Sequence, residues 1–137
     1  MEKYTYQIVS MDMDNAGSVS SKIKKLLRER GVDKNIIRRV AIASYEAEIN
    51  VVIHSVGGYC EVNIDDDTLT MNFIDYGPGI ISIENAMKKG WSTASKLDHE
   101  LGFGAGMGFP NMKDASDRLD VTSSSDGTNV EIFFNLR

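Results

Sequence analysis

The residues from Lys34 to Ser55 constrain the fold of this chain most strongly, because their pattern leaves little surface for water. A helix over this range is apolar on nearly all sides, and such a helix is largely buried. Asp33 is a suitable N-cap, and the Gly57-Gly58 pair ends the segment. The sequence therefore predicts a central helix that other elements cover. Its apolar residues are Ile36, Ile37, Val40, Ala41, Ile42, Ala43, Ile49, Val51, Val52 and Ile53.

The few polar residues of this helix are informative because they interrupt an apolar surface. Glu46, Asn50 and His54 recur every four residues and share one side of the helix. Glu48 lies about 200° around the axis from Glu46, so it cannot share a site with it. Glu46 and Asn50 are either satisfied polar groups on a buried helix or members of a site. His54 is more typical of a helix end than of a ligand.

Five segments are predicted to be strands from their alternation and their β-favouring side chains. Asp65-Asp66-Asp67 makes the turn between the second and third segments, and Asp126-Gly127 makes the turn between the last two. The acidic triplet is interpreted as a turn rather than as a metal site. The five segments are residues 4–9, 60–64, 69–75, 118–123 and 127–137.

Two more helices are predicted. The first is capped by Asp14, Asn15 or Ser18 and ends at Gly31, and the second follows Gly108 with Pro110 in its first turn. The order is strand, helix, helix, strand, strand, long segment, helix, strand, strand. Strands joined by hairpins imply a mixed, mostly antiparallel sheet. Helices covering one face of that sheet make a two-layer α/β sandwich.

Composition agrees with one globular domain over residues 1–137, since 42% of the residues are hydrophobic and 26% are charged. A net charge of −5 does not suit a nucleic-acid partner. No apolar run suits a membrane or a signal peptide, so we expect a cytoplasmic protein. Cys60 has no partner cysteine and is expected in the core. The basic face of the first helix is interpreted as solvated, with partner binding as the alternative: Lys22, Lys24, Lys25, Arg28 and Arg30.

Glycines stand at every second position just before the predicted last helix, at Gly102, Gly104, Gly106 and Gly108. Such a run lets backbone N–H groups approach a ligand, and the helix N-terminus behind it favours an anion. The alternative is a flexible loop with a helix cap. Residues 80–103, which reach the first of these glycines, form a long segment of the kind that makes lids and binding loops.

Three stretches together predict a nucleotide site. The glycine run supplies donors for phosphates, Asn50 offers an oxygen to Mg²⁺, and Glu46 can accept the proton of an attacking hydroxyl or water. Asp75 ends a strand before Gly77 and Gly79, and it can accept a hydrogen bond from the exocyclic amine of a base. Taken alone, this last stretch is also typical of a simple turn.

These stretches resemble the N box and the two glycine boxes of the GHKL ATPase superfamily, whose members share the Bergerat nucleotide-binding fold. The resemblance covers essentially the whole chain and points to the bacterial anti-sigma factor and switch-kinase branch. Residues 46–54 are similar to that branch's E-A-x-x-N-x-x-x-H box. Gly90-Trp91-Ser92-Thr93 is similar to a lid motif of stressosome-type switch kinases, and Gly127-Thr128 is similar to a pair beside the adenine.

The resemblance implies a role for each matching residue. Glu46 matches the general base, Asn50 the Mg²⁺ ligand and Asp75 the aspartate that reads adenine. ATP, ADP and Mg²⁺ are the implied ligands. The other nucleotide-binding residues belong to the two glycine boxes and to the last pair: Gly77, Gly79, Ile80, Gly104, Gly106, Met107, Gly108 and Thr128.

The implied function is an ATP-dependent serine/threonine protein kinase that phosphorylates a STAS-domain antagonist and so acts as an anti-sigma or switch regulator. A sigma factor and a second copy of the chain, meeting the sheet or the first helix, are further implied partners. The alternatives are a non-catalytic, nucleotide-gated binding module and a detached histidine kinase domain. Ile49 stands where anti-sigma members often have threonine. The lid has Lys88, Lys89 and Lys96 but no arginine, so any phosphate neutralisation there falls to a lysine.

Overall fold

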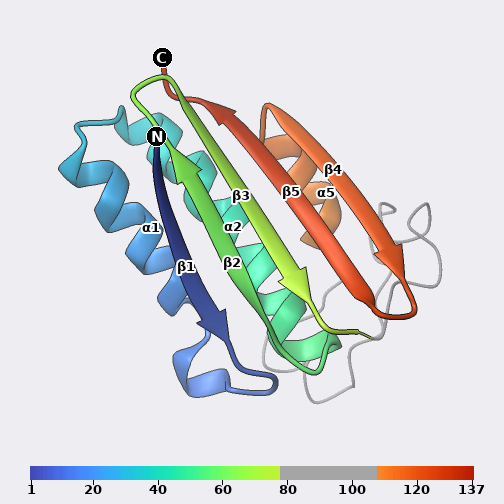
Figure 1. Ribbon diagram of the computed structural model, residues 1–137. Coiled ribbons are helices and arrows are strands. Elements are labelled where there is room, and N and C mark those ends of the chain that lie inside the picture. Colours follow the sequence, from blue (N-terminus) through green and yellow to red (C-terminus); the bar gives the residue numbers. More distant parts are fainter. Residues whose placement is uncertain (78–107) are drawn as a thin grey trace.

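The computed structural model describes residues 1–77 and 108–137, and its centre is a five-stranded sheet (Figure 1). The strands lie in the order β1-β2-β3-β5-β4, and each of the four neighbouring pairs is antiparallel. The predicted, mostly antiparallel sheet is therefore confirmed. The strands are β1 (Glu2–Ile8), β2 (Gly58–Ile64), β3 (Thr68–Asp75), β4 (Arg118–Ser124) and β5 (Gly127–Asn135).

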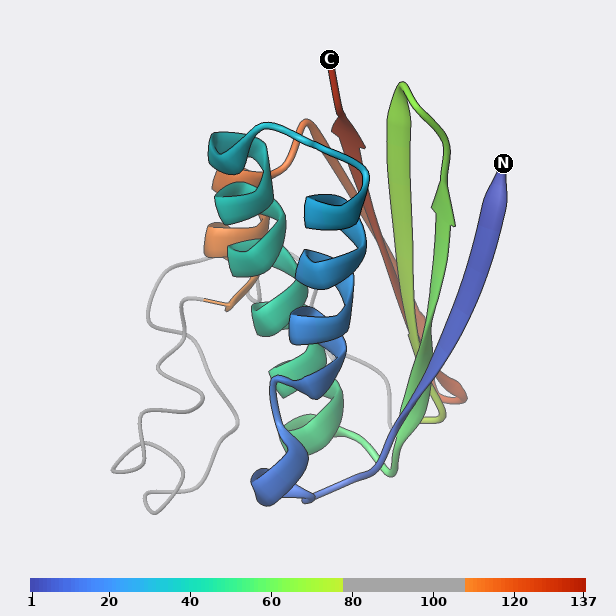
Figure 2. The ribbon, with the colours of Figure 1, turned by 90° about the vertical axis from the view of Figure 1, so that its left-hand side faces the viewer.

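The helices form a second layer on one face of this sheet (Figure 2). They are α1 (Ser18–Glu29), α2 (Lys34–His54) and α5 (Gly108–Ala115), and a 3₁₀ turn covers Met13–Asn15. The two-layer α/β sandwich and the order of the described elements are confirmed. The predicted lid at residues 80–103 lies outside the described residues. Within the described parts of the chain, no helix combines the length and apolarity needed to cross a bilayer.

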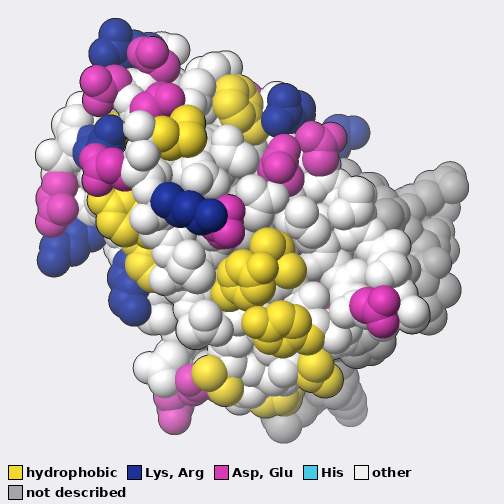
Figure 3. Space-filling view, viewed as in Figure 1, with side chains coloured by type: hydrophobic (Ala, Val, Ile, Leu, Met, Phe, Trp, Pro, Cys, Tyr) yellow, Lys and Arg dark blue, Asp and Glu magenta, His cyan; other side chains and the backbone are white. Residues whose placement is uncertain are grey.

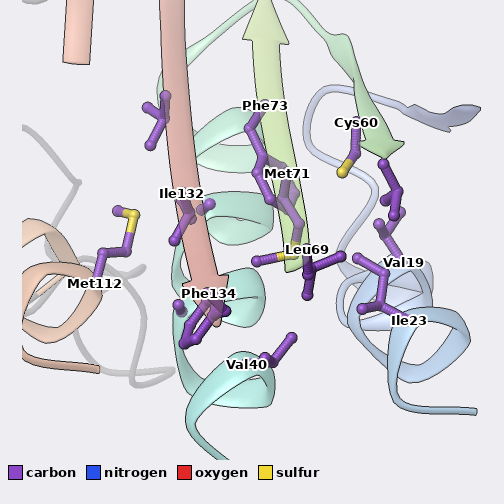
Figure 4. Packing of buried hydrophobic residues seen from close by; sticks show 14 of the residues in the cluster. Val19, Ile23, Val40, Cys60, Leu69, Met71, Phe73, Met112, Ile132 and Phe134 are labelled. Atoms are coloured by element: carbon purple, nitrogen blue, oxygen red, sulfur yellow. The ribbon is translucent and has the colours of Figure 1, made fainter. Parts of the chain in front are cut away.

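The core lies between the two layers because each strand alternates its side chains between them. In β2, for example, the core-facing side chains Cys60, Val62 and Ile64 are fully buried. Figure 4 shows the core-facing residues of β3 and β5 meeting those of the helices. Burial raises the pKa of the Cys60 thiol, so this expected core cysteine stays protonated. The opposite face of the sheet displays charged, polar and hydrophobic side chains together (Figure 3).

The start of α1 differs from the prediction that Asp14, Asn15 or Ser18 would cap it. The N-cap is Gly17, whose φ of 97° is left-handed and which has no side chain to offer. The carboxylate of Glu48 on α2 takes its place, accepting hydrogen bonds from the backbone N–H groups of Gly17 (3.0 Å), Val19 (3.2 Å) and Ser20 (3.0 Å). Glu48 therefore links two helices and, as expected, lies apart from Glu46.

Candidate functional site

Glu46 and Asn50 lie on the side of α2 that faces the start of α5. A Cβ atom placed on Gly108 would lie 3.5 Å from Glu46 Oε2 and 3.7 Å from Asn50 Oδ1. The two side-chain oxygens therefore flank the N-terminus of α5, where backbone N–H groups have no partner within the helix. The structure thus brings together three residues that the sequence singled out: Glu46, Asn50 and Gly108.

Helix α5 lies alongside α2 (Figures 1 and 2), and two hydrogen bonds hold it there. The Asn111 side-chain amide donates to Glu46 Oε1 over 3.2 Å near the start of α5, and Arg39 Nε donates to the Ala115 carbonyl over 2.8 Å at its end. Arg39 also pairs with Asp117 over 2.9 Å. Because the start of α5 meets the later of the two α2 residues and its end meets the earlier one, the two helices run antiparallel. Asn111 is not among the residues predicted for the site, although its place three residues after Gly108 puts both residues on one helix face.

Asp75, at the end of β3, is held by two backbone donors. Its Oδ1 accepts from the N–H groups of Gly77 and Thr128, each over 3.0 Å. Burial raises the pKa of Asp75, and the two N–H donors oppose that shift. Among the described residues both bonds use Oδ1, which leaves Oδ2 for another donor. Three more predicted site residues, Asp75, Gly77 and Thr128, therefore lie together where β3 ends and β5 begins.

Two of the glycines around Asp75, Gly77 and Gly127, shape the backbone that carries its hydrogen-bond donors. Gly77 has a φ of 104°, and a Cβ on it would lie 3.2 Å from the Ser125 carbonyl oxygen. At Gly127 a Cβ would lie 2.1 Å from the Asp75 carbonyl oxygen, so β5 can begin there only with glycine. Gly127 is thus essential for bringing Thr128 to Asp75. The Thr128 hydroxyl is hydrogen-bonded to Ser123 Oγ over 2.9 Å.

Space for a ligand adjoins this second group. An open hollow of about 310 Å³ is lined in part by Asp75, Ser123, Gly127 and Thr128. Asp75 Oδ2, which has no hydrogen-bond donor among the described residues, and the hydroxyl groups near it can recognise the donors and acceptors of a planar base. The predicted residues Gly79, Ile80, Gly104, Gly106 and Met107, and the lid lysines Lys88, Lys89 and Lys96, lie outside the described residues.

The described residues fit magnesium bound together with a nucleotide. The space beside Gly108, which a methyl group would fill, is bordered by oxygens of Glu46 and Asn50, and Mg²⁺ takes oxygen ligands. No group of three or more His, Cys, Asp or Glu residues in the described segments could hold a metal ion. Because Asn50 Oδ1 borders this space, a cation here would rest on Asn50 together with phosphate and water oxygens.

Known proteins of one family are similar to this chain. Residues 9–134 match the family described as the histidine kinase-like ATPase domain. The chain is 35% identical over 106 residues to an anti-sigma F factor of Clostridium beijerinckii, covering 70% of this chain and 68% of that protein. It is 30% identical over 98 residues to an anti-sigma F factor of Anoxybacillus flavithermus, covering 66% of this chain and 64% of that protein.

Two solved structures share the fold. The RsbU and RsbW domains of a Mycobacterium tuberculosis protein align with a TM-score of 0.67 at 15% identity, covering 99% of this chain and 33% of that one. The mycobacterial sensor histidine kinase MprB aligns with a TM-score of 0.56 at 18% identity, covering 99% of both. The family match covers nearly the whole chain, and the relatives and folds agree with it. The chain therefore belongs to the histidine kinase-like ATPase domain family, within the GHKL superfamily.

Proposed function

We propose that this chain is an ATP-dependent serine/threonine protein kinase that acts as an anti-sigma or switch regulator by phosphorylating a STAS-domain antagonist. The observation that carries the proposal is the position of Glu46. Its Oε2 borders the same small space as Asn50 Oδ1, at the N-terminus of α5. A carboxylate beside a cation ligand and phosphate donors suits proton removal during phosphoryl transfer. The names of the two anti-sigma F relatives support the regulatory part.

Each described site residue has one task in this proposal. Bound Mg-ATP supplies the phosphoryl group and the cation. Asn50 gives an oxygen to the cation, and the first turn of α5 directs N–H groups at phosphate oxygens. Asp75 Oδ2 accepts from the exocyclic amine of adenine, while Thr128 lies beside it. Glu46 accepts the proton of the partner's serine or threonine hydroxyl as that oxygen bonds to the γ-phosphorus of ATP, while the bond to the β–γ bridging oxygen breaks and ADP leaves.

The test is phosphate transfer from γ-labelled Mg-ATP to STAS-domain proteins of the same organism. Wild type should label a serine or threonine, giving an acid-stable phosphate. Glu46→Gln should lower the rate by roughly 10²–10⁴ yet keep the rise in melting temperature with Mg-ATP. Glu29→Gln, exposed at the end of α1, is the matched control and should transfer normally. Undiminished transfer by Glu46→Gln would sink the assigned role.

A second candidate is a nucleotide-gated binding module without catalysis. The names of the two relatives, which describe anti-sigma factors, agree with the partner binding that this candidate requires. This candidate predicts that the affinity for a sigma factor or other partner differs between Mg-ADP and Mg-ATP while no phosphoprotein forms. Binding measured by calorimetry with each nucleotide, beside the labelling experiment, separates the two functions.

A further inference from the structure

Asn111 is a side chain of the site that neither the family motifs nor the proposed function uses. Its amide Nδ2 donates to Glu46 Oε1 over 3.2 Å, and both side chains are half-buried. The partner oxygen is the one farther from the proposed chemistry, because Oε2 borders the space beside Gly108 and Asn50. The hydrogen bond thus holds Oε1 in a fixed contact and leaves Oε2 facing the space beside Gly108.

The rest of α5 holds Asn111 in place. On the core side of this helix, Phe109, Met112 and Ala115 are buried, and Met112 has no exposed surface. At the end of the helix, Arg39 Nε donates to the Ala115 carbonyl, over 2.8 Å. A helix anchored by its core face and by its C-terminal carbonyl cannot easily rotate or slide along α2. The anchored helix therefore keeps the amide of Asn111 in one position relative to Glu46.

A glutamate without such a partner has a soft terminal torsion, so its two oxygens exchange places easily. A hydrogen bond to a charged acceptor is among the stronger ones in proteins and removes this freedom. We propose that Asn111 is a positioning residue that holds Glu46 with Oε2 toward the reacting hydroxyl. The inference rests on the proposed function, because it gives Asn111 a purpose only if Glu46 removes a proton.

The competing explanation is that Asn111 merely fills space between α2 and α5. Two substitutions separate the explanations. Asn111→Asp keeps the shape but removes the donor and places a like charge beside Glu46. Asn111→Ala removes the donor and leaves a void. If positioning matters, aspartate is the more harmful in transfer; if packing alone matters, alanine is. Asn63→Asp and Asn63→Ala, on the outer face of β2, are the matched controls.

The experiment measures kcat and KM for Mg-ATP during transfer to the STAS-domain protein that wild type labels. Asn111→Ala should lower kcat roughly tenfold to hundredfold, the loss expected for one hydrogen bond to a charged group. The KM for Mg-ATP should stay within about twofold, since positioning of the base acts on the chemical step. Asn111→Asp should lose more, and the Asn63 controls should match wild type. Normal kcat in Asn111→Ala, or a raised KM with unchanged kcat, overturns the inference.

A second measurement needs no activity. In ¹⁵N-labelled protein, the Asn111 side-chain amide protons should move upfield in Glu46→Ala, because the charged acceptor is gone. Unmoved signals show that the contact does not form and overturn the inference even if the kinase is active. Failure of the proposed function looks different: wild type then labels no STAS-domain protein at all, whereas failure of the Asn111 inference leaves wild-type transfer intact.

Discussion

Asp75 contributes to the proposed site at a cost to the stability of the fold, because burial disfavours its charged form. The neutral amide introduced by Asp75→Asn would keep an oxygen for the N–H groups of Gly77 and Thr128. We therefore expect nucleotide-free Asp75→Asn to be at least as stable as wild type at pH 7. The NH₂ group of that amide, however, would meet the adenine amine donor to donor.

The check on Asp75 is the melting temperature with and without nucleotide. A ligand at about 100 times its Kd adds roughly 2.7 kcal/mol, which raises the melting point of a domain this size by several degrees. Wild type should show this rise with Mg-ATP and with Mg-ADP, and Asp75→Asn should lose both. The control is Asp120→Asn, on the exposed face of β4. A full rise in Asp75→Asn would show that Asp75 does not read the base.

The protonation of Asp75 determines the pH range in which this residue lowers the stability of the fold. Burial raises its pKa above the ordinary value of 3.8, so the folded chain binds this proton more tightly than the unfolded chain. Ionisation of Asp75 therefore lowers the free energy of unfolding as the pH rises from 3.8 through the raised pKa. Above that pKa, its contribution to the free energy of unfolding is constant. The advantage of Asp75→Asn over wild type in unfolding free energy should therefore grow across that window. Urea titrations at several pH values test this, and a constant difference contradicts it.

At the scale of elements, a side chain of α2 caps the start of α1. Glu48 is 2% exposed and accepts from three backbone N–H groups at the start of α1. Glu48→Ala leaves three donors without this partner, two of them on the buried residues Val19 and Ser20, and should cost roughly 1–3 kcal/mol of unfolding free energy. Urea denaturation measures the loss. Glu29→Ala, exposed at the other end of α1, should change stability little. A loss of only a few tenths of a kcal/mol in Glu48→Ala would mean that water replaces the carboxylate.

Element boundaries show what local sequence can and cannot predict. The periodicity of apolar residues predicted each described strand and the central helix to within two residues, because that pattern is a local consequence of having a buried face. The cap of α1 was predicted wrongly because the acceptor comes from 28–31 residues away. The last hairpin turn was displaced by one residue: Ser124 pairs with Gly127, so Ser125 and Asp126 make the turn.

At the scale of the molecule, the sequence predicted which residues gather but not how they touch. Glu46 and Asn50 share a helix face by spacing alone, so their proximity was predictable. Asn111 meets Glu46 across 65 positions, and Arg39 meets the Ala115 carbonyl across 76. Those contacts depend on how α5 packs on α2, which periodicity does not encode. The resemblance to a family assigned roles to Asp75 and Thr128, whereas only the fold shows their hydrogen bond.

Amide hydrogen exchange should differ between the strands of the sheet, and the proposed ligand should slow it directly at only one end of the sheet. The core-facing side chains of β3 are almost entirely buried, and β3 is paired on both sides, whereas β4 is an edge strand without a buried residue. In hydrogen exchange without nucleotide, amides of β3 should therefore exchange last and those of β4 early.

Mg-ADP should then slow exchange at the end of β3, the start of β5 and the first turn of α5, where the site residues lie. The far end of the sheet, where Glu2 pairs with Ile64, should gain only what the global stabilisation gives. Equal protection at both ends would mean that nucleotide stabilises the fold without binding at Asp75 and Gly108. Protection at the α5 end alone would mean that phosphates bind there while the base lies elsewhere.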